Sequence, residues 1–334
     1  MRKALALLFL GLVALGQEVV VYPGFAEVKE PVVLPPSTWV YLAGERLARI
    51  PQGSLRLLGV EEAERVYQGG AVLFRYRGEG QAVLRYLYTG LSGEVFYTLE
   101  GGPLSPMRLT AWARLRLEGE ALEAKRLTLL AGEASLLEAR APQAALRALG
   151  EASPGSPFGL FRYELPGRKL LPGTTEIPFL KAAVAPERLL RYQAPFRTDR
   201  LLPVERGYRF PAPFPLAPGT LEVTEAGFFL GQAPMPPTPE GERTEVWLGR
   251  DLEARLARRV ERVGEGEKEA TYRVETRLEN PYPYPVALLL SETFPRPFRL
   301  DFPGADLLPE GYRLEVPLKP KEVRTLVYRL TLPR

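Results

Sequence analysis

The chain has 334 residues, of which 46% are hydrophobic and 25% are charged, a composition typical of a globular protein. It contains no Cys and no His, which excludes disulfides, thiolate or imidazole metal sites, Cys nucleophiles and acid–base relays that need imidazole. The formal net charge is +4, with acidic and basic residues interspersed rather than clustered, so a nucleic-acid-binding face is not expected.

The first 16 residues have the pattern of a secretory signal peptide. Arg2 and Lys3 form a charged start, residues 4–13 are apolar apart from one Gly, and small residues precede Gln17, where we expect cleavage. The apolar run is shorter than the roughly 20 residues of a transmembrane helix. No Cys follows it that could carry a lipid. The mature chain is therefore expected outside the cytoplasm, in the periplasm, in the cell envelope or secreted, with no transmembrane span.

Short segments with apolar residues at alternate positions dominate the rest of the chain, and this period of two is typical of half-buried strands. Pro and Gly separate them at short intervals, as in antiparallel sandwiches. We predict an all-β protein with two antiparallel β-rich domains, residues 17–185 and 186–334, the second an immunoglobulin-like sandwich. The expected strands cover residues 19–22, 26–34, 39–42, 71–76, 82–88, 95–99, 107–117, 158–165, 189–193, 221–224, 228–230, 270–279, 286–290 and 323–332.

Four segments are predicted differently. Residues 143–149 could form a short helix, residues 150–157 look like a connector, and residues 232–243, with four Pro, look like a long loop. Residues 251–263 are ambiguous between strand and helix. Their apolar residues are spaced for a helical face and the segment is rich in good helix formers, so periodicity favours the helix.

Residues 82–334 contain a series of short motifs whose order along the chain matches that of a known family. The series resembles the mucoidy-inhibitor-like domain-of-unknown-function family of bacterial envelope proteins. The resemblance implies a β-rich envelope protein with no established catalytic residues, and it implies that residues 251–263 are a strand, the interpretation adopted here. The motifs are Tyr88-Thr89-Gly90-Leu91-Ser92, Tyr97-Thr98-Leu99, Ala111-Trp112-Ala113, Leu127-Thr128-Leu129-Leu130-Ala131-Gly132-Glu133, Leu216-Ala217-Pro218-Gly219-Thr220, Phe229-Leu230-Gly231, Val246-Trp247-Leu248-Gly249-Arg250-Asp251 and Glu279-Asn280-Pro281.

Motifs for common chemistries are incomplete. The sequences Gly78-Glu79-Gly80 and Gly264-Glu265-Gly266 lack the further residues of a phosphate-binding loop and are predicted to be hairpin turns. No Gly-x-Ser-x-Gly or Ser-x-x-Lys motif is present. Asp301 and Asp306 could offer oxygens to Ca²⁺, but six or more ligands are needed, so a plain loop is favoured.

Carboxylates and aromatics leave one alternative open. Glutamates cluster near turns and are interpreted as solvated surface, although a glycosidase needs only two carboxylates. Aromatics beside Arg recur and fit strand alternation better than a glycan platform. The Pro-Tyr-Pro-Tyr-Pro run at residues 281–285 is predicted to be a rigid turn. The glutamates are Glu61, Glu62, Glu64, Glu265, Glu267 and Glu269.

We therefore expect a secreted, non-enzymatic cell-envelope protein with a structural or protein-binding role. No catalytic, cofactor-binding or metal-binding residues are assigned, and no cofactor is expected. The partner would be an envelope protein or a surface glycan, with the oligomeric state left open. The alternative is a carbohydrate-binding or carboxylate-based glycan-active protein. Abundant Pro, abundant Arg and a single Asn fit a thermophilic source.

Overall fold

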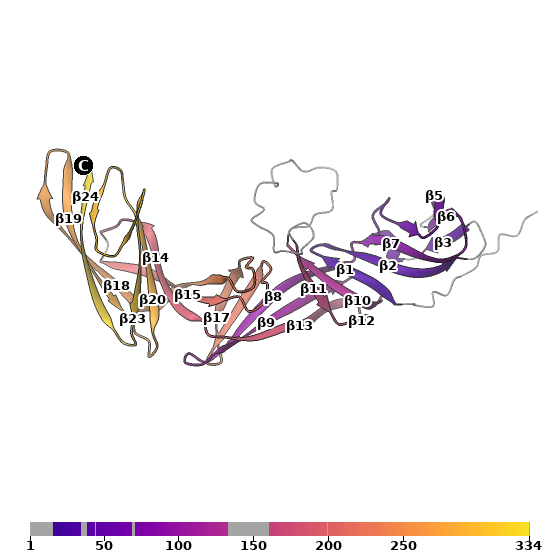
Figure 1. The fold of residues 1–334 in the computed structure, drawn as a ribbon, viewed down its shortest axis with the longest axis horizontal. Helices are drawn as coiled ribbons and strands as arrows, with labels where there is room; N and C mark the ends of the chain where they lie inside the picture. The colour runs from indigo at the N-terminus through magenta and orange to yellow at the C-terminus, as the bar shows by residue number, and fades with distance from the viewer. Residues whose placement is uncertain are drawn as a thin grey trace, which may run out of the picture. The chain divides into compact units, whose positions relative to one another are not determined.

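The computed structural model describes residues 16–34, 39–43, 45–68, 71–132, 160–198 and 200–333, and these are built almost entirely from β-strands (Figure 1). Within these ranges the only helical element is the short 3-10 helix η1 (Glu45–Arg49). The predicted all-β fold class is confirmed. Residues 1–15 of the predicted signal peptide, the predicted helix at 143–149 and the connector at 150–157 lie outside the described residues.

Contacts group the chain into two compact units. The first comprises Met1–Phe96 and Ala111–Leu180, and the second comprises Tyr97–Thr110 and Lys181–Arg334. Neither unit is one continuous segment, because the divisions fall inside three strands of a five-stranded sheet. The predicted domain boundary after residue 185 stays a prediction. In order across that sheet the strands are β13 (Gly173–Val184), β9 (Met107–Leu117), β8 (Leu91–Gly101), β16 (Gly219–Glu225) and β17 (Phe228–Met235).

The first unit contains a seven-stranded and a three-stranded sheet. The central strand β1 (Gln17–Tyr22) pairs parallel with one neighbour and antiparallel with the other, and it buries Val19 and Val21 on one face. This is the alternation that the sequence predicts. The larger sheet has the order β11 (Phe161–Leu165), β10 (Leu122–Ala131), β1, β2 (Phe25–Leu34), β7 (Gly80–Tyr88) and β4 (Arg56–Leu58), with β12 (Arg168–Leu170) also on β10. The smaller sheet has the order β3 (Trp39–Ala43), β6 (Ala71–Arg77) and β5 (Glu61–Gln68).

The second unit is dominated by one nine-stranded sheet that curls around its own core. Tyr312 and Tyr328 lie on strands six places apart in the sheet, yet their ring centroids are 5.9 Å apart, so opposite arms of the sheet face each other as in a sandwich. The order is β21 (Arg299–Asp301), β24 (Val323–Pro333), β19 (Glu269–Glu279), β18 (Arg243–Glu265), β15 (Leu201–Pro211), β14 (Glu187–Pro195), β20 (Val286–Thr293), β23 (Gly311–Leu318) and β22 (Asp306–Leu308).

Residues 251–263 belong to strand β18, so the helix that periodicity favours is wrong and the strand is correct. The strand pairs with β15 on one side and β19 on the other. Residues 252–255 have no partner on β15 and form a bulge, because Asp251 pairs with Val204 and Leu256 with Leu202. The bulge exposes Leu252 while Leu256 is buried, which splits the apparent helical face between solvent and core.

Two turn predictions need correction. The Gly78-Glu79-Gly80 segment is not a hairpin turn, because it connects β6 to β7 and these strands belong to different sheets. The predicted loop at residues 232–243 begins later than expected, since β17 continues to Met235 and pairs with β16 through Pro234. The Gly264-Glu265-Gly266 segment lies at the β18–β19 hairpin as predicted, but Gly264 and Glu265 still belong to β18, and only Gly266 is in the turn, where its N–H donates to the Glu269 carbonyl at 2.9 Å.

Candidate functional site

A cavity of about 280 Å³ opens in the second unit. Its walls come from β14, β15, the β16–β17 hairpin, β18 and the turn between β19 and β20. We call it the tyrosine pocket. Its lining brings three carboxylates and three tyrosines together in one concave site, which is the general character of a ligand-binding site. Its polar and aromatic lining residues are Arg188, Arg206, Tyr208, Glu225, Phe228, Asp251, Glu253, Tyr282 and Tyr284.

The Pro-Tyr-Pro-Tyr-Pro run forms the rigid turn that the sequence predicts. Asn280, which is buried, fastens it from within. Its side-chain amide donates to the carbonyls of Tyr284 and Lys319 at 2.9 and 2.8 Å, and its side-chain oxygen accepts from the Tyr282 N–H at 3.0 Å. The rings of Tyr282 and Tyr284 are consequently held parallel, with centroids 5.0 Å apart and planes inclined by 2°.

Asp251 connects this turn to the bulge of β18. One carboxylate oxygen accepts the backbone N–H groups of Glu253 and Ala254 at 2.9 and 2.8 Å, and the other accepts the Tyr282 hydroxyl at 2.5 Å. The carboxylate is buried, and these three hydrogen bonds engage both of its oxygens. Burial and the hydrogen bond to Asp251 raise the pKa of Tyr282. The tyrosine therefore stays a proton donor at neutral pH.

Glu225, at the end of β16, is the second buried carboxylate of the pocket that accepts side-chain hydrogen bonds. It accepts from Arg188 at 3.1 Å and from the Tyr208 hydroxyl at 2.7 Å. The Arg188 guanidinium also lies 4.5 Å from the centroid of the Tyr284 ring, within cation–π range. Burial, with a contribution from Glu225, raises the pKa of Tyr284 to about 12. Arg188 and Glu225 thus compensate each other's charge.

An apolar hairpin tip stands at the rim of the tyrosine pocket. Ala226 and Gly227 have φ of 51° and 82°, the pair of positive values that a type I′ turn needs, and Gly accommodates its value without strain. The turn places Phe228 beside the pocket with 74% of the residue exposed, and Phe229 is also exposed. We call Phe228 and Phe229 the Phe hairpin. Exposed Leu252 lies on the β18 bulge, between the pocket residues Asp251 and Glu253.

The glutamates that the sequence singles out lie elsewhere, and most are exposed. Glu62 is the exception, since it is half-buried and accepts from Arg65 and from the Leu57 N–H. Glu61 and Glu64 pair across strands with Arg77 and Arg75, and Glu269 pairs with Arg299. These three fit the interpretation as solvated surface, and none of the singled-out glutamates lines the tyrosine pocket. Short-range sequence patterns missed Arg188 and Glu225, because the two residues are 37 positions apart and only the sheet brings them together.

Aromatics beside Arg follow the predicted alternation. Phe74, Tyr76, Tyr86 and Tyr163 are buried while their Arg neighbours are exposed. Asp301 and Asp306 are both exposed, at the end of β21 and the start of β22. Across the described ranges, no group of three or more Asp or Glu side chains is placed to hold a metal ion.

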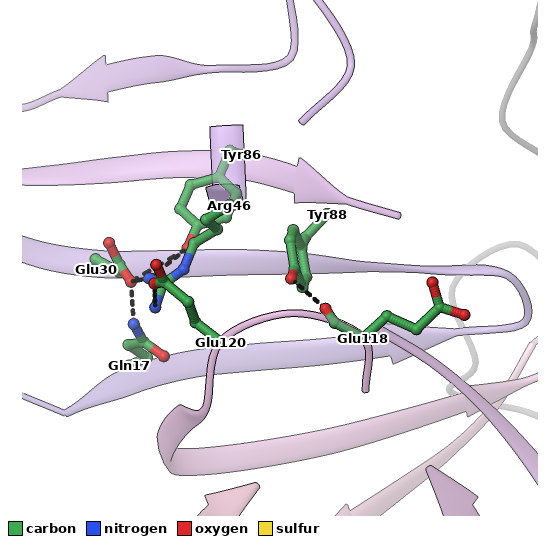
Figure 2. Close-up of polar contacts among 7 residues, drawn as sticks. All are labelled: Gln17, Glu30, Arg46, Tyr86, Tyr88, Glu118 and Glu120. Carbon is green, nitrogen blue, oxygen red and sulfur yellow. Dashed lines mark hydrogen bonds and ion pairs between the residues drawn. The ribbon is translucent and has the colours of Figure 1, made fainter. Parts of the chain in front are cut away.

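The first unit contains a buried carboxylate of its own (Figure 2). Glu30 on β2 has a nearly inaccessible side chain and accepts from Arg46 at 2.9 Å and from the Tyr86 hydroxyl at 3.1 Å. The Gln17 amide also donates to it, and Arg46 reaches on to exposed Glu120 at 3.3 Å. These contacts tie η1 to strands β1, β2 and β7. We interpret the cluster as structural, since each of its acids has a partner within it.

The pH dependence of this cluster is testable. Burial raises the pKa of Glu30 above 4.5, against the opposing effect of Arg46. The folded state then binds the proton more tightly than the unfolded state. The Glu30 contribution to the free energy of unfolding should therefore fall as the pH rises from 4.5 through the raised pKa. Urea denaturation across this range should show the fall in the parent chain and not in Glu30→Gln.

Glu27, on the same strand, provides a control with the opposite sign. Burial acts to raise its pKa, but hydrogen bonds from Arg85 and Lys29 prevail and hold it below 4.5. Its stabilising contribution should be present above pH 4.5 and be lost as the pH falls through the lowered pKa. Equal pH slopes in Glu30→Gln and Glu27→Gln would contradict this assignment.

No family model matches the chain, and no curated protein matches it. In the part of the chain that the structure describes, no helix has the length and apolar character that crossing a membrane requires.

Proposed function

We propose that this protein acts outside the cytoplasm as a non-enzymatic binding protein of the cell envelope, with the Phe hairpin and the adjoining tyrosine pocket as its binding surface. The location rests on the charged start and short apolar run of residues 1–16. The observation that carries the binding role is Phe228, which is 74% exposed on a rigid hairpin while lining a pocket.

The partner we favour is another envelope protein. Large aromatic side chains that are exposed on a rigid element are typical anchors of protein interfaces, because their burial removes much apolar surface from water. Phe228, Phe229 and Leu252 offer such surface without a polar group of their own. The pocket beside them is held in shape by internal hydrogen bonds and could receive a partner side chain without rearranging.

A catalytic role is disfavoured by the state of the acids. A general acid or base must reach the proton that it transfers. Of the three pocket acids, Glu225 and Asp251 are buried, and each already accepts hydrogen bonds from Arg or Tyr side chains or from the backbone. Glu253 is exposed, so the lining offers one accessible carboxylate rather than the pair that glycoside hydrolysis uses. The arrangement of the two buried acids is suited to shaping the pocket. This supports binding rather than turnover.

Glycan binding remains the second candidate, and one observation favours it. The stacked rings of Tyr282 and Tyr284 share the pocket with three carboxylates, and aromatic faces with nearby polar groups suit sugars. Because the apolar Phe hairpin would gain little from a sugar's hydroxyl groups, we rank this candidate below a protein partner.

Site-specific crosslinking distinguishes the two candidates. A photoreactive phenylalanine analogue at position 228 of the full chain, in the cells that produce it, should give one discrete protein adduct. The matched control carries the analogue at Leu307, which is also exposed and lies on β22 of the same unit. A polysaccharide adduct at position 228 would favour the glycan candidate. Identical adducts at both positions, or none at position 228, would contradict the proposed surface.

A further inference from the structure

A second cavity in the same unit has a distinct chemical character. It measures about 410 Å³ and is lined by segments of β14 and β15, by Arg197 after β14, and by Arg250 of β18. Its charged residues are Arg191, Arg197, Arg250 and Glu205, so three positive groups face one negative group and the lining carries a net charge of +2. We call it the arginine pocket.

The charge imbalance is built into the register of the sheet. Arg191, Glu205 and Arg250 are paired across the three adjacent strands β14, β15 and β18, with Glu205 in the middle. One carboxylate therefore lies between two guanidinium groups. The Glu205 carboxylate forms an ion pair with Arg191, whose Nε donates to one carboxylate oxygen at 3.0 Å and whose Nη2 donates to the same oxygen.

A cation–π contact also holds Arg191 in place, since its guanidinium lies 4.1 Å from the centroid of the Trp247 ring. Such a group loses little conformational freedom when a ligand binds. Arg250 and Arg197, in contrast, have exposed side chains that make no hydrogen bond or ion pair with any residue that the structure describes. Two guanidinium groups at the pocket are therefore available to an anion.

The remaining lining is apolar or amide. Leu202 and Val204 are buried and form part of the wall, and Gln193 adds an amide. The volume lies in the range of cavities that hold small organic ligands and exceeds the need of an inorganic ion. Guanidinium groups bind carboxylate and phosphate oxygens through charge-assisted hydrogen bonds.

We propose that the arginine pocket is a binding site for a small organic oxyanion, a carboxylate or phosphate on a body the size of one sugar. The site is independent of the Phe hairpin, because the two cavities share no lining residue. Arg250 and Arg197 would supply the bonds to the oxyanion, while Arg191 contributes a fixed positive charge. The proposal stands whether or not the protein partner exists.

Calorimetric titration of the full chain tests the site with four probes: glucuronate, glucose 6-phosphate, neutral glucose and inorganic phosphate. We expect at least one charged sugar to bind about tenfold or more tightly than glucose, and more tightly than phosphate, with affinity falling as salt is added. If glucose binds as tightly as the charged sugars, the proposal that the pocket recognises an oxyanion is wrong. If inorganic phosphate binds as tightly as both charged sugars, the proposal that the ligand is the size of a sugar is wrong.

Variants locate the binding. Arg250→Gln and Arg197→Gln should each weaken the charged sugar about tenfold. Arg313→Gln, which removes an exposed charge from β23 of the same sheet, should leave the affinity unchanged. Because all three side chains are exposed, unchanged melting temperatures are expected and serve as the folding control. An equal loss in Arg313→Gln, or no loss in Arg250→Gln, would overturn the assignment.

Discussion

Replacing Arg258 with Met is expected to lower the free energy of unfolding by about 3–5 kcal/mol, the usual cost of breaking a buried ion pair. The side chains of Arg258 and Glu292 are 1% and 0% exposed, and they meet at 2.6 Å. The second oxygen of Glu292 accepts the hydroxyls of Tyr312 and Tyr328, each at 2.9 Å. Burial raises the pKa of both tyrosines, so both stay donors at neutral pH. Removing Arg258 leaves the carboxylate uncompensated in the core.

Two further variants make this prediction specific. The double variant Arg258→Met/Glu292→Leu removes both charges, so it should lose less stability than Arg258→Met alone. Arg259→Met changes the neighbouring exposed residue and should cost well under about 1 kcal/mol. Urea denaturation measures all three. If Arg258→Met and Arg259→Met unfold at the same urea concentration, the ion pair does not contribute to the core as described.

Replacing Tyr328 with Ala should cost about 3–5 kcal/mol, the range for a buried aromatic. Tyr328 lies on the apolar side of the alternation in residues 323–332 and is buried, with its ring centroid 4.6 Å from that of Phe302 and its hydroxyl donating to Glu292. Arg329→Ala, one position along and exposed, should cost well under about 1 kcal/mol. The difference between Tyr328→Ala and Arg329→Ala tests the strand register, because a slip of one residue would exchange the buried and the exposed side chains.

Tyr272 shows where the sequence interpretation went too far. Its alternation predicts a ring in the core, but the residue is only partly buried and packs against the edge of the cluster. Tyr272→Ala should therefore cost less than Tyr328→Ala, while Arg273→Ala should again cost little. Thermal melts of the four Ala variants settle the order. If the Arg variants melt below the Tyr variants, the pairing of β19 with β24 is misassigned.

Alternation predicted many of the strands because most strands bury only one face, but the predicted set omits β5, β10, β13, β15 and β23. Residues 107–117 form β9 with the predicted bounds, and β24 adds one residue to the predicted end. The pattern failed in β18, where the bulge exposes Leu252 and the core holds charged Arg258. A buried Arg looks like a surface position in a sequence, and its partner Glu292 is 34 residues away.

Only the part of the tyrosine pocket that comes from consecutive residues could be predicted from the sequence. The Pro-Tyr-Pro-Tyr-Pro run and the single Asn before it are visible in the sequence and form the predicted rigid turn. Arg188 and Glu225 come from distant strands, so no local spacing signals their contact. The arginine pocket depends in the same way on the pairing of three strands, which places Glu205 between two arginines.

The most direct test of the proposed binding role is the affinity of the purified full chain for the protein crosslinked at position 228. We expect Phe228→Ala/Phe229→Ala to weaken the complex by about 30-fold or more, the loss that removing an interface anchor of 2 kcal/mol produces. Leu307→Ala, which truncates an equally exposed apolar residue of the same unit, should leave the affinity unchanged. Unchanged affinity in the double Phe variant, or an equal loss in Leu307→Ala, would contradict the proposal that the Phe hairpin is the binding surface.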